Sequence, residues 1–412
     1  MESDQPRGAV DARLSAWCLI DDWLMGRCER IADGIIGTAG GRDVALAREL
    51  ALGVVRWQRL YDALTAPLLR PGDQPRALRI ALRLLCHQLF ALDRIPARAA
   101  VHATVAAAKT AGAGHLAGVV NAVGRRLAEL VLPERQGDGP LGRLAREYWP
   151  RLPGECHSLP DLLVNHLAAC MPDQAHISLA ALNLMPPLCT RTRPGRPSPR
   201  GAGIIRQEGE WTWWSDPHLA LSGPVADGLC VVQDHAQGEV LAAARVRPGE
   251  RVLDLCAAPG GKSLAFADAG CRVVAADVNP HRLPRLKANL TGAASLILAD
   301  GLRPALADRA FDLVLVDAPC SNSGVLGRRP EARWRYTRET LAGLEELQRA
   351  LLSSSAALVA EGGRLIYSTC SLSPCENQQL AQSLPGWRLL SERLTWPDAW
   401  QGGGYVAVLV RK

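Results

Sequence analysis

Two cysteines in the C-terminal half of the chain occupy positions suited to nucleophilic chemistry. Cys320 closely follows the apolar run at residues 313–316, and Cys370 follows the run at residues 364–367. Both runs are typical of buried parallel strands, so each thiol is expected near the C-terminal end of a strand, where open α/β sheets bind ligands. Because a thiolate attacks carbon well, the pair indicates covalent catalysis. Free cysteine is more often a small apolar core residue, so the choice between a catalytic and a core role depends on the neighbouring motifs.

A glycine-rich loop lies upstream, between a predicted strand at 251–253 and a predicted helix at 263–267. Its small residues let the backbone approach a ligand closely, and the helix N–H groups favour an anionic group. Lys262 closes the loop in a chain that has only four lysines, which suggests a need for a compact ammonium there. The loop residues predicted to bind a cofactor are Cys256, Ala257, Ala258, Pro259, Gly260, Gly261 and Lys262.

Acidic residues close four successive predicted strands. They are Asp254, Asp277, Asp300 and Asp317. A single aspartate in such a place more often caps the following helix, but four in register outline a ligand cleft. An acid at the end of the second strand suits ribose hydroxyls, so Asp277, with Asp300 and Asp317, is predicted to contact the cofactor.

Three cofactor classes compete for this kind of sheet. A dinucleotide dehydrogenase uses the same strand-end acid, but its Gly-x-Gly-x-x-Gly fingerprint is absent. A complete phosphate-binding loop also fails, because Cys256 stands where its first glycine belongs. S-adenosylmethionine therefore fits better than NAD or ATP, and no metal site is predicted.

Three motifs together resemble the RNA cytosine-5 methyltransferases, and within them the bacterial small-subunit (16S) ribosomal RNA methyltransferase B family, also called Sun or Fmu. The motifs are residues 254–262, 317–324 and 367–377. Residues 52–59 and 120–127 are similar to the NusB-like RNA-binding domain of that family. The resemblance covers nearly the whole chain and is loosest over 150–230.

The resemblance implies an α/β Rossmann-like class I methyltransferase domain at 239–412. An all-α NusB-like domain is expected at 1–145, and a small α+β RNA-recognition-like subdomain at 146–238. Hydrophobic residues at three- and four-residue steps independently predict helices at 46–64 and 116–130.

The implied reaction is methylation of carbon 5 of a specific cytosine in 16S ribosomal RNA through a covalent cysteine adduct, with S-adenosylmethionine as cofactor. In this family pattern Cys370 is the nucleophile, and Cys320 assists proton removal or product release. Asp317 hydrogen-bonds the cytosine edge, with Lys262 supporting it. The chemistry explains the thiol, because carbon 5 becomes nucleophilic only after addition to carbon 6.

Two other functions stay open. Relatives with the same catalytic motifs methylate transfer RNA, although the NusB-like segment favours ribosomal RNA. An inactive RNA-binding or antitermination factor is the second alternative, against which both thiols, the loop and the four acids argue.

The charge balance gives weaker information about partners. The excess of basic over acidic residues is only +6, and 43 of the 47 basic residues are arginine. A GC-rich genome would produce the same bias. The segment 191–214 combines five arginines with three tryptophans, a pairing of charge and stacking surface that predicts RNA contact. The alternative is a loop followed by a strand with partly buried tryptophans.

Compartment and assembly are predicted from features of the whole chain. Residues 1–6 are polar and resemble no signal peptide, and no apolar run reaches the roughly 18 residues of a membrane span. Twelve cysteines without a paired Cys-x-x-Cys framework favour a reducing cytoplasm over zinc or disulfides. A monomer acting on free ribosomal RNA or an early assembly intermediate is expected.

Two local departures from the family pattern deserve notice. The segment 233–237 is one residue shorter than the pattern, which leaves its geometry open. Cys375 stands where the family generally has glutamate, and its place after Pro374 predicts the start of a helix and not a third catalytic thiol.

Overall fold

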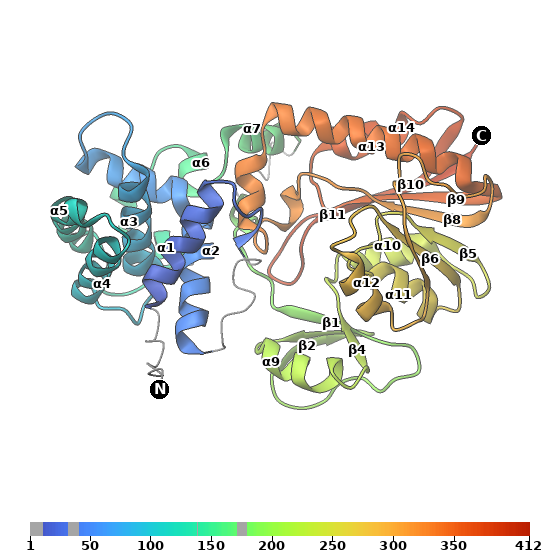
Figure 1. The fold of residues 1–412 in the computed structure, drawn as a ribbon, viewed down its shortest axis with the longest axis horizontal. Coiled ribbons are helices and arrows are strands. Elements are labelled where there is room, and N and C mark those ends of the chain that lie inside the picture. Colours follow the sequence, from blue (N-terminus) through green and yellow to red (C-terminus); the bar gives the residue numbers. More distant parts are fainter. Residues whose placement is uncertain (1–10, 32–40, 138, 171–178) are drawn as a thin grey trace, which may run out of the picture. The chain divides into compact units, whose positions relative to one another are not determined.

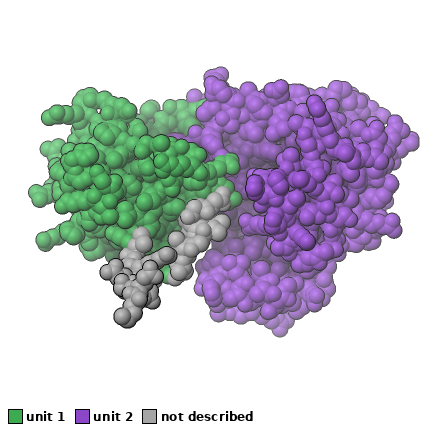
Figure 2. Space-filling model, viewed as in Figure 1, with its two compact units in different colours: residues 1–164 green, residues 165–412 purple. Residues whose placement is uncertain are grey.

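The computed structural model describes residues 11–31, 41–137, 139–170 and 179–412. The polar segment 1–6 lies outside these residues. The chain forms two compact units, residues 1–164 and 165–412, which Figure 2 colours separately. The three-domain division with boundaries at 145 and 238 stays a prediction.

Within its described residues the first unit is helical, as predicted, apart from one isolated bridge between Val131 and Leu144. Its helices are α1 (Ala12–Leu24), α2 (Arg42–Thr65), α3 (Arg76–Cys86), α4 (Ala97–Thr110), α5 (Ala117–Glu129) and the short α6 (Pro153–Cys156), with α7 (Asp161–Cys170) crossing into the second unit. The helices α2 and α5 match the predicted periodic segments. Packing between α3 and α5 is tight at Gly124, where a Cβ would lie 2.9 Å from a methyl carbon of Leu85.

The second unit begins with a small antiparallel sheet of order β2-β3-β1-β4. Its strands are β1 (Leu188–Thr192), β2 (Ile204–Glu208), β3 (Trp211–Trp214) and β4 (Cys230–Val232), and the short helix α9 (Pro217–Ala220) follows β3.

The prediction that the tryptophans of this sheet form an exposed stacking surface is wrong. Trp211, Trp213 and Trp214 are all buried, at 8%, 1% and 3% exposure. The physical reason is cover from segments outside the sheet, because the rings of Trp211 and Trp213 pack against His235, and Trp213 also packs against Trp400. Arg191 is also buried and donates to Gln233 Oε1 at 2.8 Å.

The large sheet has the order β10-β11-β9-β8-β5-β6-β7. Its strands are β5 (Arg251–Asp254), β6 (Arg272–Asp277), β7 (Ser295–Leu298), β8 (Phe311–Asp317), β9 (Val359–Thr369), β10 (Trp387–Thr395) and β11 (Gly404–Arg411). The neighbours from β7 to β9 are parallel, and β11 is antiparallel to both β9 and β10. All five strands predicted around the site are present, which confirms the Rossmann-like α/β expectation.

Helices cover both faces of this sheet (Figure 1). They are α10 (Gln237–Ala244), α11 (Gly261–Asp268), α12 (Leu283–Leu290), α13 (Arg338–Leu358) and α14 (Gln378–Gln382). On β8, Val314 and Val316 belong to a core cluster with α13 and α14, whereas Leu313 and Leu315 belong to one with α10 and α11. Alternate residues thus point to opposite covered faces, which explains the continuous apolar run.

The strand order fixes where a ligand binds. From β5 the chain adds β6 and β7 on one side and then crosses back to place β8 and β9 on the other, so the strand order reverses at β5. Open α/β sheets bind ligands at the carboxyl ends of the strands beside such a switch point. The glycine-rich loop follows β5 there, and both cysteine loops leave the neighbouring strands β8 and β9 at the same edge.

Candidate active site

The two cysteines are in contact. Cys320 Sγ lies 3.2 Å from Cys370 Sγ, although the residues are fifty positions apart in sequence. Parallel pairing of β8 with β9, which extends to Asp317 opposite Ser368, brings both loops to one place. Cys320 is buried and Cys370 is half-buried, so the sequence-based expectation that both thiols reach the same sheet edge is confirmed.

The surroundings make the two thiols unequal. A hydrogen bond from Cys320 lowers the pKa of Cys370, and the positive charge of Arg329 adds to this effect. The same contact, together with burial, raises the pKa of Cys320 well above its usual value. Asn322 Oδ1, 3.2 Å from Cys370 Sγ, accepts from a protonated thiol and so opposes the thiolate. The pKa of Cys370 is thus lowered and that of Cys320 is raised by the same contact.

The predicted pair Asp317 and Lys262 lies directly beside the cysteine loops. Lys262 Nζ donates to Asp317 Oδ2 at 2.6 Å, and Ser368 Oγ donates to Asp317 Oδ1 at 2.6 Å. The lysine side chain is 10% exposed and the aspartate side chain 35%. The carboxylate is therefore oriented from two sides while one edge stays open to a ligand.

The glycine-rich loop is held against the end of β6. Asp277 is buried; its Oδ2 accepts the Ala258 N–H at 3.1 Å and its Oδ1 accepts the Asn279 N–H at 2.9 Å. Gly260 has φ +105°, and a Cβ there would lie 2.8 Å from Leu286 Cδ1. Glycine is thus required at this position both by backbone conformation and by close approach. Burial raises the pKa of Cys256 in the same loop, so this thiol stays protonated.

The other two strand-end acids differ from each other. Asp254 is buried beneath the loop, where burial raises its pKa to about 7. Ser263 donates to its Oδ2 at 2.6 Å, while Oδ1 is buried without a hydrogen-bond partner. Asp300 is exposed and accepts the Leu302 N–H at 2.9 Å. Asp300 therefore caps the turn after β7, the role that a lone aspartate commonly has.

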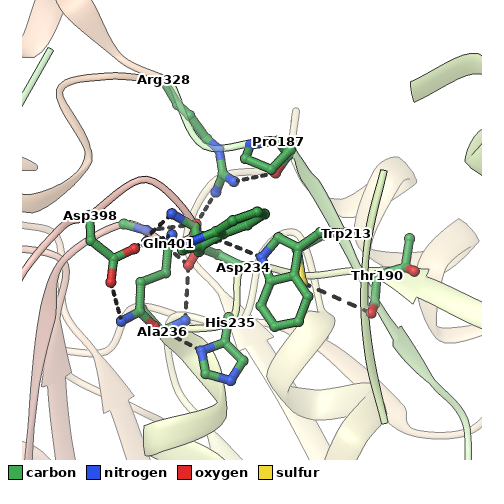
Figure 3. A network of polar contacts seen from close by, with 12 residues as sticks. Pro187, Thr190, Trp213, Asp234, His235, Ala236, Arg328, Asp398 and Gln401 are labelled. Atoms are coloured by element: carbon green, nitrogen blue, oxygen red, sulfur yellow. Dashed lines mark hydrogen bonds and ion pairs between the residues drawn. The ribbon is translucent and has the colours of Figure 1, made fainter. Parts of the chain in front are cut away.

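The segment 233–237, which was expected to be one residue shorter than the family pattern, forms a tight polar junction within the second unit (Figure 3). Asp234 accepts the N–H groups of Ala236 at 2.9 Å and Gly402 at 3.2 Å, and it pairs with Arg328. Arg328 also donates to Pro187 O at 3.2 Å. The junction ties the small sheet to the loop that follows Cys320 and to the turn before β11, so this segment forms a closed turn that α10 follows directly.

The sequence interpretation missed a cluster of hydroxyl groups around a buried carboxylate. Ser321 and Ser371 both donate to Glu376 Oε2 at 2.5 Å. The sequence did carry a signal, because each cysteine is followed by serine, in Cys320-Ser321 and Cys370-Ser371. Cys375 precedes the carboxylate in a short 3-10 turn, η10 (Pro374–Glu376), which agrees with its prediction as the start of a helical segment.

Metal-binding clusters and membrane-spanning helices are both absent from the part of the chain that the structure describes. In residues 11–31, 41–137, 139–170 and 179–412, no group of three or more histidine, cysteine, aspartate or glutamate side chains is arranged to hold a metal ion. Over the same ranges no helix combines the length and apolar character that crossing a membrane requires.

Together the strand order and the loop after β5 define a Rossmann-like methyltransferase, preceded by a helical unit. The model of the family described as 16S rRNA methyltransferase RsmB/F matches residues 241–391, and that of the NusB family matches residues 20–129. The chain is 35% identical to the probable ribosomal RNA small subunit methyltransferase B of Synechocystis, over 86% of this chain and 84% of that protein.

Further comparisons agree. The ribosomal RNA small subunit methyltransferase B of Erwinia tasmaniensis is 32% identical, over 84% of this chain and 83% of that protein. The crystal structure of PH0851 has the same fold, with a TM-score of 0.74 and 20% identity, over 98% of this chain and 99% of that one. The chain belongs to the 16S rRNA methyltransferase RsmB/F family, whose members use S-adenosylmethionine.

Proposed function

We propose that the protein methylates carbon 5 of a cytosine in 16S ribosomal RNA through a covalent adduct with Cys370. The observation that carries this proposal is the thiol pair, with 3.2 Å between Cys320 Sγ and Cys370 Sγ at the open edge of the sheet. Methylation of a ring nitrogen requires no sulfur nucleophile, whereas methylation of carbon 5 requires one. The names of the relatives support ribosomal RNA of the small subunit as the substrate.

The loop after β5 fits S-adenosylmethionine, which supplies an electrophilic methyl group. Asp277 uses one acceptor site on each carboxylate oxygen for a backbone N–H, which leaves acceptor capacity for two ribose hydroxyls. Gly260 fixes the path of this loop, because its positive φ and its close approach to Leu286 disfavour any side chain there.

In the first half of the reaction, Cys370 Sγ bonds to carbon 6 of the cytosine. The electron pair of the bond between carbons 5 and 6 becomes available at carbon 5. Carbon 5 then bonds to the methyl carbon as the bond from that carbon to the sulfonium sulfur breaks, and the electron pair of the broken bond would stay on sulfur in a neutral thioether. Asp317 faces the cytosine edge and stabilises charge that develops on the ring, and Lys262 and Ser368 hold it in that orientation. The lowered pKa of Cys370 increases the fraction of reactive thiolate.

In the second half, the proton leaves carbon 5, its electron pair restores the ring double bond, and the bond from Cys370 Sγ to carbon 6 breaks. The sequence left two roles for Cys320, proton removal and product release. Its raised pKa favours the second, because a protonated thiol 3.2 Å away stabilises the departing thiolate by hydrogen bonding. The carbon-5 proton then passes to water.

Replacing each thiol separately tests this mechanism. We expect Cys370→Ala to abolish methylation and to form no covalent RNA complex. Cys320→Ala should accumulate an RNA adduct that survives a denaturing gel, because release is impaired after addition. Cys375→Ala is the matched control, since this thiol lies in η10 beyond the two loops and should change neither readout. Exchanged behaviour of Cys370→Ala and Cys320→Ala would overturn the assignment.

The substrate is tested in cells. Bisulfite sequencing of ribosomal RNA from a deletion strain should reveal one cytosine in 16S RNA that has lost its methyl group. Loss of a methyl group in transfer RNA instead would establish the alternative substrate, and no loss in either RNA would favour an inactive RNA-binding factor. We further propose that the protein acts in the cytoplasm as a monomer, on free ribosomal RNA or an early assembly intermediate.

A further inference from the structure

A fully buried carboxylate lies behind the two cysteine loops. Glu376 is 0% exposed. Its Oε1 accepts the Ser321 N–H at 2.8 Å and Gln348 Nε2 at 3.0 Å, and its Oε2 accepts the hydroxyls of Ser321 and Ser371, each at 2.5 Å. Burying a charge without such donors is very costly. Four donors therefore satisfy this carboxylate and fix its position.

The donors link the two loops to each other. Ser321 follows Cys320 directly, and Ser371 follows Cys370 directly, so one carboxylate contacts the residue beside each thiol. The ladder between β8 and β9 ends at Asp317 and Ser368, before either cysteine. Beyond it, the loops are joined by the Gly324 N–H donating to Cys370 O at 2.9 Å and by the hydroxyl cluster on Glu376.

We infer that Glu376 is a positioning residue that holds Cys320 against Cys370 and thereby determines which of the two thiols is reactive. This inference deepens the proposed covalent mechanism and rests on it. Geometry carries the inference, because contact between the thiols requires the two loops to keep their separation. Electrostatics supports it, since the charge of Glu376 adds to the Cys370 contact and burial in raising the pKa of Cys320.

A purely structural role for Glu376 predicts a different result. The residue also accepts a hydrogen bond at its backbone carbonyl from Tyr367 OH at 2.6 Å, and that contact survives any change of its side chain. If the side chain only stabilised the fold, its loss would lower the melting temperature but leave the relative reactivity of the thiols unchanged. The relative reactivity is therefore the decisive readout.

The experiment measures alkylation of Cys370 and Cys320 in the full-length protein without RNA or cofactor. Limiting iodoacetamide is added near neutral pH, and mass spectrometry of the two peptides gives the ratio of their rates. In the wild type, Cys370 should react much faster. In Glu376→Gln the ratio should fall about tenfold, because the two serine hydroxyls lose the charged acceptor that joins the loops. Both loosened loops and the lost charge act in this direction.

Two further variants make the result interpretable. Glu250→Gln removes a half-buried carboxylate that pairs with Arg364 at 2.7 Å. Glu250 lies just before β5 and far along the chain from both cysteine loops, so this variant should leave the ratio unchanged. Ser371→Ala detaches only the Cys370 loop from the carboxylate and should give an intermediate ratio even if Glu376→Gln does not fold. If Glu376→Gln folds and its alkylation ratio stays within about twofold of the wild-type ratio, the inference is overturned. If Glu376→Gln does not fold, the same result in Ser371→Ala overturns it.

The outcome is separable from that of the proposed function. Methylation of 16S RNA by the wild type tests the function, whereas the alkylation ratio uses no RNA. An active wild type whose ratio is unaffected by Glu376→Gln would refute only the positioning role. Both the proposed function and the positioning role would be supported if the wild type is active and Glu376→Gln shows a reduced alkylation ratio and a lower kcat at unchanged cofactor affinity.

Discussion

Asp277 offers the most direct test of the cofactor site, through the substitution Asp277→Asn. The side chain is 4% exposed, and its two oxygens each accept one backbone N–H, from Ala258 and Asn279. Asparagine preserves the volume but replaces one oxygen with an NH₂ group. That group presents a donor to a backbone N–H and removes an acceptor that faces the ribose.

The magnitude follows from the lost hydrogen bond. A hydrogen bond to a charged group contributes about 1.5–3 kcal/mol. Because every 1.4 kcal/mol changes a dissociation constant tenfold, S-adenosylmethionine should bind roughly 10- to 150-fold more weakly. Loosening of the 256–262 loop, which Asp277 anchors through the Ala258 N–H, acts in the same direction.

Isothermal calorimetry with S-adenosylmethionine measures the effect, and thermal unfolding checks that the variant is folded. The control is Asp312→Asn, which breaks a 2.8 Å ion pair with Arg251 at the start of β8, the opposite end of the same sheet. That control should affect stability but not cofactor affinity. A folded Asp277→Asn protein that binds the cofactor as tightly as the wild type would remove Asp277 from the site.

Two other predictions concern stability and substrate selection. Burial raises the pKa of Asp254 to about 7, so the folded chain keeps this proton where the unfolded chain, with a pKa near 4, has lost it. The free energy of unfolding, measured by urea titration, should therefore fall by about 3 kcal/mol between about pH 5 and pH 8. If Asp254→Asn shows the same dependence on pH, titration of Asp254 is not its cause. Removing residues 1–160 should leave cofactor affinity intact, because the loop and acids follow residue 250. Methylation of 16S RNA should drop sharply and recover partly at low salt, where the remaining phosphate contacts strengthen; full activity of the truncated, folded protein would place selection elsewhere.

The site elements predicted from sequence are those that the sheet itself determines. Apolar runs define strands, and the topology brings the ends of parallel neighbours to one edge. Contact between Cys320 and Cys370 and the anchoring of the glycine loop by Asp277 therefore follow from strand assignment. Asp300 ends the outermost parallel strand region, after β7, where it is exposed and accepts the Leu302 N–H, and its contact with the cofactor stays a prediction.

Burial of individual side chains was harder to predict. Trp213 lies in a short stretch rich in arginine and tryptophan, which suggested an exposed stacking surface. In the structure its ring is 1% exposed, and its Nε1 donates to Trp400 O at 2.7 Å, a partner 187 positions away. Local composition cannot reveal a cover supplied by so distant a segment. Arg196 and Arg200 in the same stretch are exposed, so the charge is available there while the aromatic surface is not.

Glu376 was missed because the residues next to it in sequence do not indicate that it is buried. A glutamate after a proline is an ordinary residue of a helix start, and solvent is its usual environment. Its meaning comes from donors on three other segments, at Ser321, Gln348 and Ser371. The repeated Cys-Ser pair was the available hint, since two identical dipeptides at neighbouring strand ends place two hydroxyls where one acceptor can reach both. The reactivity of the thiols is thus linked to a residue that would touch neither substrate nor cofactor, which is why the alkylation ratio of Glu376→Gln is more informative than its activity alone.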